Sequence, residues 1–170
     1  MGKRYSDLDI RMKNNYETVA KTRLLRRTPV IIRIDGKAFH TFTRGMKKPF
    51  DEILVKSMQS TMKYLCENIQ GCVFGYTQSD EITLILIDYQ TLTTEAWFDY
   101  EVQKMCSIAA SMATMAFNKY FPIVASNWIE DHKDIDDDYL KTLINNVDKG
   151  ALFDARCFNI PREEVTNNIY

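Results

Sequence analysis

The chain has 170 residues, of which 45% are apolar and 26% charged, and its formal net charge at pH 7 is −1. This size suits a single domain over residues 1–170 whose core needs no disulfide or structural metal. The sequence contains no apolar run of about eighteen residues and no apolar N-terminal stretch typical of a signal peptide, so we expect a cytoplasmic protein without membrane contact. Four separated cysteines without a CxxC pair and two histidines argue against a redox centre or a histidine-rich zinc site.

The charges are unevenly distributed. Residues 1–60 carry 14 Lys and Arg against 6 Asp and Glu, a balance of +8, whereas residues 61–170 carry 8 against 17, a balance of −9. The basic N-terminal section, residues 1–27 and the positions after it, could bind a polyphosphate or an RNA backbone, although a solvated surface has the same composition. We interpret the acidic run 130–138 as an exposed loop or helix start and not as a metal site, because nothing positions its carboxylates.

The first predicted elements are a strand and a helix. Residues 30–34 form a nearly continuous apolar run, typical of a central strand, which Asp35 and Gly36 end with a turn. After Asp51 the apolar residues recur at alternating steps of three and four, which predicts an amphipathic helix that stops before Gly71.

The second half of the chain repeats the pattern with a hairpin before its helix. Residues 72–76 and 81–88 predict two strands joined by a short turn. A second helix is expected over about 97–120 and a fourth strand over 151–160, after which Pro161 is predicted to open another helix.

This order of elements predicts an α+β domain of the ferredoxin-like βαββαβ kind, an antiparallel sheet with helices on one face. Right-handed crossovers place the third strand between the first and the second. The end of the first strand, with Asp35, then lies beside the start of the third, with Asp80 and Glu81. Clustered carboxylates repel one another unless cations neutralise them, and such hard oxygen ligands suit Mg²⁺. The arrangement is that of the palm of nucleotidyl-transferring enzymes, which use two metal ions. Taken singly, these acids would also suit a turn and a hairpin tip.

Three motifs in a fixed order make the prediction more specific. They are D-G-x-x-F-H at residues 35–40, K-P-x-D at 48–51 and Q-S-D-E at 78–81. Together with Gln103-Lys104, residues 107–118, Phe153-Asp154-Ala155-Arg156 and residues 161–165, they make the chain resemble the tRNA-histidine guanylyltransferases and their 3′–5′ polymerase relatives. The resemblance covers the chain from about residue 28 to its end.

The resemblance implies an enzyme that adds nucleotides to the 5′ end of tRNA, in the direction opposite to ordinary polymerases. A 5′-monophosphate is first activated with ATP or GTP, and the 3′-hydroxyl of an incoming nucleoside triphosphate then attacks the activated end. By resemblance, Asp35, the carbonyl of Gly36 and Asp80 would hold two Mg²⁺ ions. The implied catalytic residues are Asp35, Asp80 and Glu81, with Glu81 in support.

The resemblance also implies a nucleotide site. Its residues would be Asp35, Gly36, Lys37, Ala38, Phe39, His40, Lys48, Asp51, Ser79, Asp80 and Lys104. The ring of His40 would lie against a base, Ser79 and Lys48 would contact phosphate oxygens, and Asp51 and Lys104 would lie near the activating triphosphate. Each also has a structural interpretation: Asp51 suits a helix cap, Ser79 a turn, and His40, Lys48 and Lys104 an exposed surface.

Two features depart from the family pattern. Glu101 stands where eukaryotic members carry an arginine, and the chain ends at residue 170, where family members continue into a further region. We expect a homo-oligomer, a dimer or tetramer, since assembly would enlarge the basic surface that tRNA meets. Other classes stay open: a nucleotide cyclase on the same palm, or a nucleotide-binding or RNA-binding module without catalysis. The sequence leaves open whether the substrate is tRNA-histidine or any tRNA shortened at its 5′ end.

Overall fold

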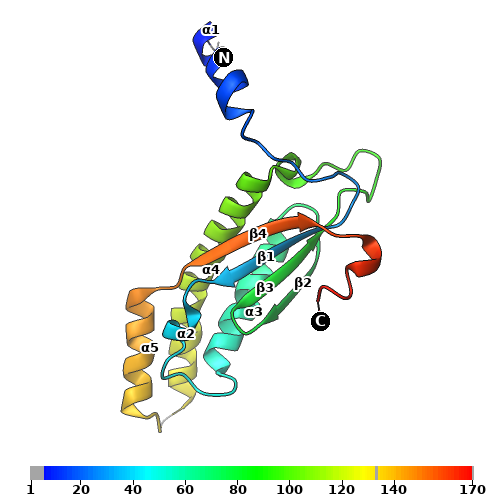
Figure 1. Cartoon of the computed structure of the whole chain (residues 1–170). Coiled ribbons are helices and arrows are strands. Elements are labelled where there is room, and N and C mark those ends of the chain that lie inside the picture. Colours follow the sequence, from blue (N-terminus) through cyan, green and yellow to red (C-terminus); the bar gives the residue numbers. More distant parts are fainter. Residues whose placement is uncertain (1–5, 133, 170) are drawn as a thin grey trace.

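A computed structural model describes residues 6–132 and 134–169. Its centre is a four-stranded antiparallel sheet in the order β2-β3-β1-β4 (Figure 1). The strands are β1 (Val30–Gly36), β2 (Cys72–Gln78), β3 (Glu81–Leu86) and β4 (Phe153–Asn159). Because β3 lies between β1 and β2 and runs antiparallel to β1, the predicted α+β topology is confirmed.

Two long helices cover one face of the sheet (Figure 1). They are α3 (Glu52–Asn68) and α4 (Val102–Asp131). The alternation of strand side chains turns Ile32 and Ile34 of β1 into the core beneath these helices, where both are fully buried. Intervening residues such as Arg33 therefore point to the opposite, open face. This open face positions the site described below.

The second half of the chain is more helical than predicted. The helix expected over 97–120 begins as a 3₁₀ turn, η2 (Trp97–Tyr100), and α4 then continues to Asp131 with Pro122 inside it. The acidic run ends at the start of a helix, α5 (Asp137–Lys149), which confirms the helix-start alternative, although the extent of this helix was not predicted. Asp136 caps its first turn by accepting a hydrogen bond from the Tyr139 amide. The helix expected after Pro161 is only a short 3₁₀ turn, η3 (Arg162–Glu164).

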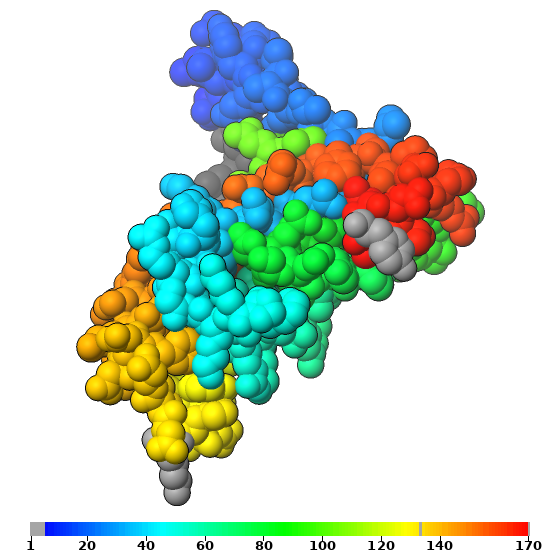
Figure 2. All heavy atoms as spheres, turned by 60° about the horizontal axis from the view of Figure 1, so that its bottom comes forward, coloured from blue at the N-terminus to red at the C-terminus, as the bar shows by residue number. Residues whose placement is uncertain are grey.

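Three short elements complete the fold: α1 (Asp7–Met12), the π-helical turn η1 (Lys13–Glu17), and α2 (Phe39–Phe42) in the loop after β1. The segment formed by α1 and η1 buries no residue and projects from the body of the molecule (Figures 1 and 2). None of the helices within residues 6–132 and 134–169 is long and apolar enough to cross a membrane.

Part of the basic N-terminal section is neutralised within the chain. Lys21 Nζ lies 3.6 Å from Glu101 Oε2, and Arg23 Nε lies 3.2 Å from Asp99 Oδ2. Arg26 is also paired, with its Nε 2.6 Å from an oxygen of the buried Asp88 carboxylate. Ion pairs reduce the charge that a surface offers to a polyanion, so these cations contribute less to RNA binding than the sequence alone suggested.

The four cysteines are free thiols, as expected. Cys106 of α4 and Cys157 of β4 lie with their sulfur atoms 3.4 Å apart. Burial raises the pKa of Cys72 and of Cys157 to about 12, which keeps both protonated and unreactive at neutral pH.

Candidate active site

The candidate site begins with Asp35, which lies near the end of β1, an inner strand of the sheet. In the strand register Asp35 lies opposite Glu81 of β3 on one side and Asp154 of β4 on the other. Because Ile34 points into the core, Asp35 projects from the open face. The register therefore places three carboxylates in one row across the sheet.

The turn between β2 and β3 brings Asp80 to the same place. The Gly36 amide donates a hydrogen bond of 3.1 Å to the Asp80 carbonyl, which joins the end of β1 directly to the turn. Ser79 adopts a left-handed backbone with φ 55°, and its hydroxyl donates to Asp80 Oδ1 at 3.0 Å. The structure thus brings Asp35, Gly36, Ser79 and Asp80 together, as the topology predicted.

The electrostatics of Asp35 reflect this crowding. Burial raises the pKa of its carboxyl above the ordinary value, and repulsion from Asp80 and Asp154 raises it further. Arg156 acts in the opposite direction, with its Nη2 4.0 Å from Asp35 Oδ2. A cation bound between the carboxylates would relieve the repulsion.

The donor set at this edge fits magnesium in kind. Two carboxylates, Asp35 and Asp80, and the Gly36 carbonyl are hard oxygen ligands. Across residues 6–132 and 134–169, no three His, Cys, Asp or Glu side chains are grouped so that they could hold an ion by themselves. Mg²⁺ usually keeps several waters and substrate phosphate oxygens and needs only one or two carboxylates. The residues present therefore suit an ion that arrives with a nucleotide better than a permanent structural ion.

Glu81, which was expected to support the metal ligands, forms an ion pair with an arginine. Its Oε1 lies 3.2 Å from Nε of Arg33, one row further along the open face. This ion pair engages one oxygen of the Glu81 carboxylate, whose charge also contributes to the repulsion that raises the pKa of Asp35. In this arrangement Glu81 fixes Arg33 and is not an evident third ligand.

A cavity of about 360 Å³ lies beside Asp80 and is the candidate nucleotide site. Six of the predicted residues line it, together with Thr43, which the sequence analysis missed. The lining residues are Gly36, Ala38, Phe39, His40, Thr43, Ser79 and Asp80. Thr43 is fixed there because its hydroxyl donates to the Phe39 carbonyl at 2.8 Å, a contact for which the sequence carries no signal.

The loop after β1 is shaped by its glycine and by one aromatic anchor. A Cβ on Gly36 would come 2.2 Å from the Phe39 ring, so the close approach requires glycine. Phe39 is buried and packs against Phe42, Phe117 and Phe153. With that ring committed to the core, the neighbouring His40 stays exposed at the cavity, where its imidazole can meet a base.

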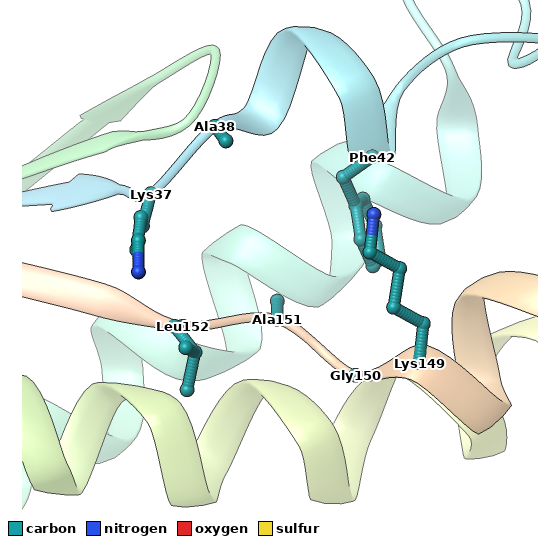
Figure 3. A pocket seen from close by; sticks show the side chains of 7 residues that line it. All are labelled: Lys37, Ala38, Phe42, Lys149, Gly150, Ala151 and Leu152. Atoms are coloured by element: carbon teal, nitrogen blue, oxygen red, sulfur yellow. The ribbon is translucent and has the colours of Figure 1, made fainter.

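Lys37 faces a second, smaller cavity of about 230 Å³ on the β4 side (Figure 3). Its amide donates to the Leu152 carbonyl at 2.8 Å, and its side chain extends toward the chain before β4, where Lys149 ends α5 (Figure 3). Lys37 therefore belongs to the other side of Asp35 from the candidate nucleotide site, in contrast to the expectation that it lines that site.

Asp51 is a structural residue by its contacts. It is 3% exposed, and its Oδ1 accepts hydrogen bonds from the amides of Ile53 and Leu54, which makes it the N-cap of α3. Its Oδ2 accepts from the Lys47 amide at 3.0 Å and from the Tyr139 hydroxyl at 2.7 Å. With both oxygens engaged, the expected position near a triphosphate is not what the structure gives, and the helix-cap interpretation fits instead.

Two further predicted residues lie outside the cavity lining. Lys48 is exposed in the loop before α3. Lys104 is exposed in the first turn of α4, where its Nζ lies 4.8 Å from the centroid of the Phe98 ring. Glu101, beside it, is the partner of Lys21. Lys48 and Lys104 could reach a second triphosphate only if that ligand extended beyond the cavity.

Comparison with known proteins places this chain in a family. A sequence model described as tRNAHis guanylyltransferase matches residues 10–161, which is most of the chain. The chain belongs to the tRNAHis guanylyltransferase family. Its fold also agrees with a bacterial tRNA(His) guanylyltransferase-like protein solved in complex with ATP, at a TM-score of 0.76 and 39% identity over 95% of this chain and 62% of that chain. A structure of such a bacterial protein in complex with GTP has the same score and identity, and the match covers 95% of this chain and 68% of that chain.

Two curated relatives share less sequence identity with this chain than the two bacterial structures do. An uncharacterized protein, R259, of Acanthamoeba polyphaga mimivirus is 33% identical over 134 residues, which are 74% of this chain and 42% of that protein. The tRNA(His) guanylyltransferase of Schizosaccharomyces pombe is 31% identical over 106 residues, 59% of this chain and 39% of the enzyme. This tRNAHis guanylyltransferase family member thus spans less than half the length of these two relatives.

Proposed function

We propose that this family member is a nucleotidyltransferase that adds nucleotides in the 3′–5′ direction to the 5′ end of tRNA, with Mg²⁺ and with ATP and GTP as substrates. The observation that carries the proposal is the junction of β1 with the β2–β3 turn. There the Asp35 carboxylate lies close enough to Asp80 for the two charges to repel each other, and Gly36 and Asp80 line a cavity of about 360 Å³. Two carboxylates without a cation are electrostatically unfavourable, and a magnesium nucleotide would supply one.

In the proposed reaction the chain's own residues hold and orient the reactants. Asp35, Asp80 and the Gly36 carbonyl would hold Mg²⁺, which when bound supplies charge neutralisation for the triphosphate and a lowered pKa for the attacking hydroxyl. The Ser79 hydroxyl donates to Asp80 in the free chain and would donate to a phosphate oxygen when a nucleotide is bound. The exposed His40 ring would orient the base at the cavity mouth. Lys48 and Lys104 would attract a second triphosphate from outside the cavity.

The proposal is tested by offering the chain labelled GTP and ATP with Mg²⁺ and one of two RNAs. One is a tRNA lacking its first nucleotide, and the other is intact tRNA-histidine. We expect label in the RNA, abolished by EDTA, and more of it in the shortened tRNA if the protein repairs 5′ ends. Binding of GTP without label in either RNA would contradict the proposal and favour a binding module. A cyclic product from GTP alone, without RNA, would favour a cyclase.

We further propose that the protein works as a homo-oligomer. Helices α4 and α5 expose several apolar side chains, among them Met115, Ile123 and Ile144, each 50% exposed or more. Apolar surface of this kind is often covered by another subunit. Light scattering during size-exclusion chromatography should give the mass of a dimer or tetramer. A monomer that still extends tRNA would refute this part of the proposal.

A further inference from the structure

The open face of the sheet carries two arginines in one register row, and the chain uses them differently. Arg33 of β1 lies opposite Arg156 of β4. Arg33 is committed: its Nε pairs with Glu81, and its Nη2 donates to the carbonyl and to the side-chain oxygen of Asn168 at 3.0 and 3.1 Å. Its side chain is accordingly only 26% exposed.

Arg156 is free by comparison. Its side chain is 64% exposed, and its ion pair with Asp35 is long, at 4.0 Å, which is outside hydrogen-bonding distance. A guanidinium has five N–H donors in a planar fork that matches the oxygens of a phosphate. Arg156 therefore presents an available anion-binding group one strand away from the candidate metal ligand.

The position of Arg156 relative to the cavity suggests which anion it meets. Asp35 lies on β1, with the cavity and the Ser79–Asp80 turn on its β3 side and Arg156 on its β4 side. Nucleotidyl transfer to RNA joins two phosphorylated molecules at one metal site. If the incoming nucleotide fills the cavity, the RNA end reaches Asp35 most directly from the β4 side. Lys37 also lies on the β4 side of Asp35 and adds a second positive charge there (Figure 3).

We propose that Arg156 binds a backbone phosphate at the 5′ end of the RNA substrate and so positions that end beside Asp35. This inference rests on the proposed function, because it assigns the second substrate of the same site. The carboxylates of Asp35 and Asp154 flank Arg156 and oppose an anion there. A cation at Asp35 removes part of that opposition and releases the guanidinium, so the contribution of Arg156 to RNA binding increases when Mg²⁺ is present.

The test compares Arg156→Ala with Lys119→Ala, which removes one exposed positive charge from α4, the helix layer on the opposite side of the sheet. Binding of a 5′-shortened tRNA is measured by fluorescence anisotropy at several salt concentrations, with and without Mg²⁺. Arg156→Ala should weaken binding roughly tenfold in Mg²⁺ and lower the slope of log affinity against log salt by about one unit. GTP binding should change less than about twofold, and Arg156→Lys should keep most of the salt slope.

Three results would overturn the inference. Arg156→Ala could bind RNA as Lys119→Ala does, it could lose GTP affinity as much as RNA affinity, or the wild-type chain could fail to bind the RNA at all. Thermal unfolding of each variant confirms that the exposed substitutions leave the fold intact. If RNA binding depends on Arg156 but the wild type incorporates no label, the proposed transferase activity fails while the RNA-binding role of Arg156 stands.

Discussion

At the scale of single residues, the candidate site holds the carboxylates of Asp35, Asp80 and Asp154 near one another, which lowers the stability of the folded chain. Repulsion from Asp80 and Asp154 and partial burial both raise the pKa of Asp35, which means that the folded chain disfavours the ionised form. Nothing in the packing needs that charge, since Asp35 projects from the open face. An unfavourable charge that serves no packing role is typical of functional sites.

Asp35→Asn should therefore raise the melting temperature of the free protein at neutral pH. The pKa of Asp35 is higher in the folded than in the unfolded chain, so its ionisation lowers stability as pH rises through these pKa values. The gain from asparagine should shrink as the pH falls and vanish once Asp35 is protonated in both states. Thermal unfolding across pH measures this, with the exposed Asp134→Asn as control. A lower melting temperature for Asp35→Asn at neutral pH would contradict the electrostatic account.

Asp80→Asn should lower the rate of nucleotide addition by at least about a hundredfold, because a neutral amide cannot replace the carboxylate as a metal ligand. Its thermal stability should be unchanged or raised. Incorporation of labelled GTP into 5′-shortened tRNA is the measurement, with Asp134→Asn, at an exposed aspartate outside the site, as the control. Retained turnover in Asp80→Asn would refute the role of Asp80.

The sequence predicted the principal acids because strand order alone brings the end of β1 beside the β2–β3 turn. It could not assign Asp51, because a cap and a phosphate contact have the same signature, an acid just before a helix. Only the hydroxyl of Tyr139, 88 positions away, decides between them. Nor could the sequence single out Arg156, because only the tertiary packing decides which arginine of the open face is already paired.

At the scale of elements, Asp51 ties the start of α3 to α5 and to the loop at Lys47. Asp51→Ala should lower the free energy of unfolding by about 2 kcal/mol, through the lost cap and the unpaired Tyr139 hydroxyl. Urea unfolding measures the loss. Asp51→Asn keeps an acceptor oxygen and should lose less, while still binding GTP. If Asp51→Asn unfolds like the wild type but fails to bind GTP, Asp51 contacts the nucleotide after all.

The strands and the first part of α4 were predictable, whereas the end of α4 and the extent of α5 were not. Pro122 and the acidic run obscured the end of α4 and the start of α5. The signals of α5 are nevertheless present: Asp136 caps it, Tyr139 and Leu143 are buried four residues apart, and Gly150 ends it. A capping aspartate inside an acidic run was not separable from its solvated neighbours by composition.

At the scale of the whole molecule, the sheet divides the chain into a structural and a chemical face. Helices α3 and α4 bury one face (Figure 1). The other face carries the acid row of Asp35, the paired Arg33 and the more exposed Arg156. The balance of +8 in residues 1–60 suggested a broad basic surface for RNA. Ion pairs between residues 21–27 and acids of the second half neutralise part of this positive charge. RNA binding would therefore rely on a few cations at defined positions.

The proposed metal and nucleotide site is tested most directly by a crystal structure of the chain with GTP and with Mn²⁺ in place of Mg²⁺. The anomalous signal of manganese then locates the metal. We expect manganese bound by the carboxylates of Asp35 and Asp80 and the carbonyl of Gly36, with the triphosphate of GTP in the cavity beside Ser79. Manganese and GTP bound elsewhere, or Asp35 and Asp80 left without metal while GTP occupies the cavity, would contradict it.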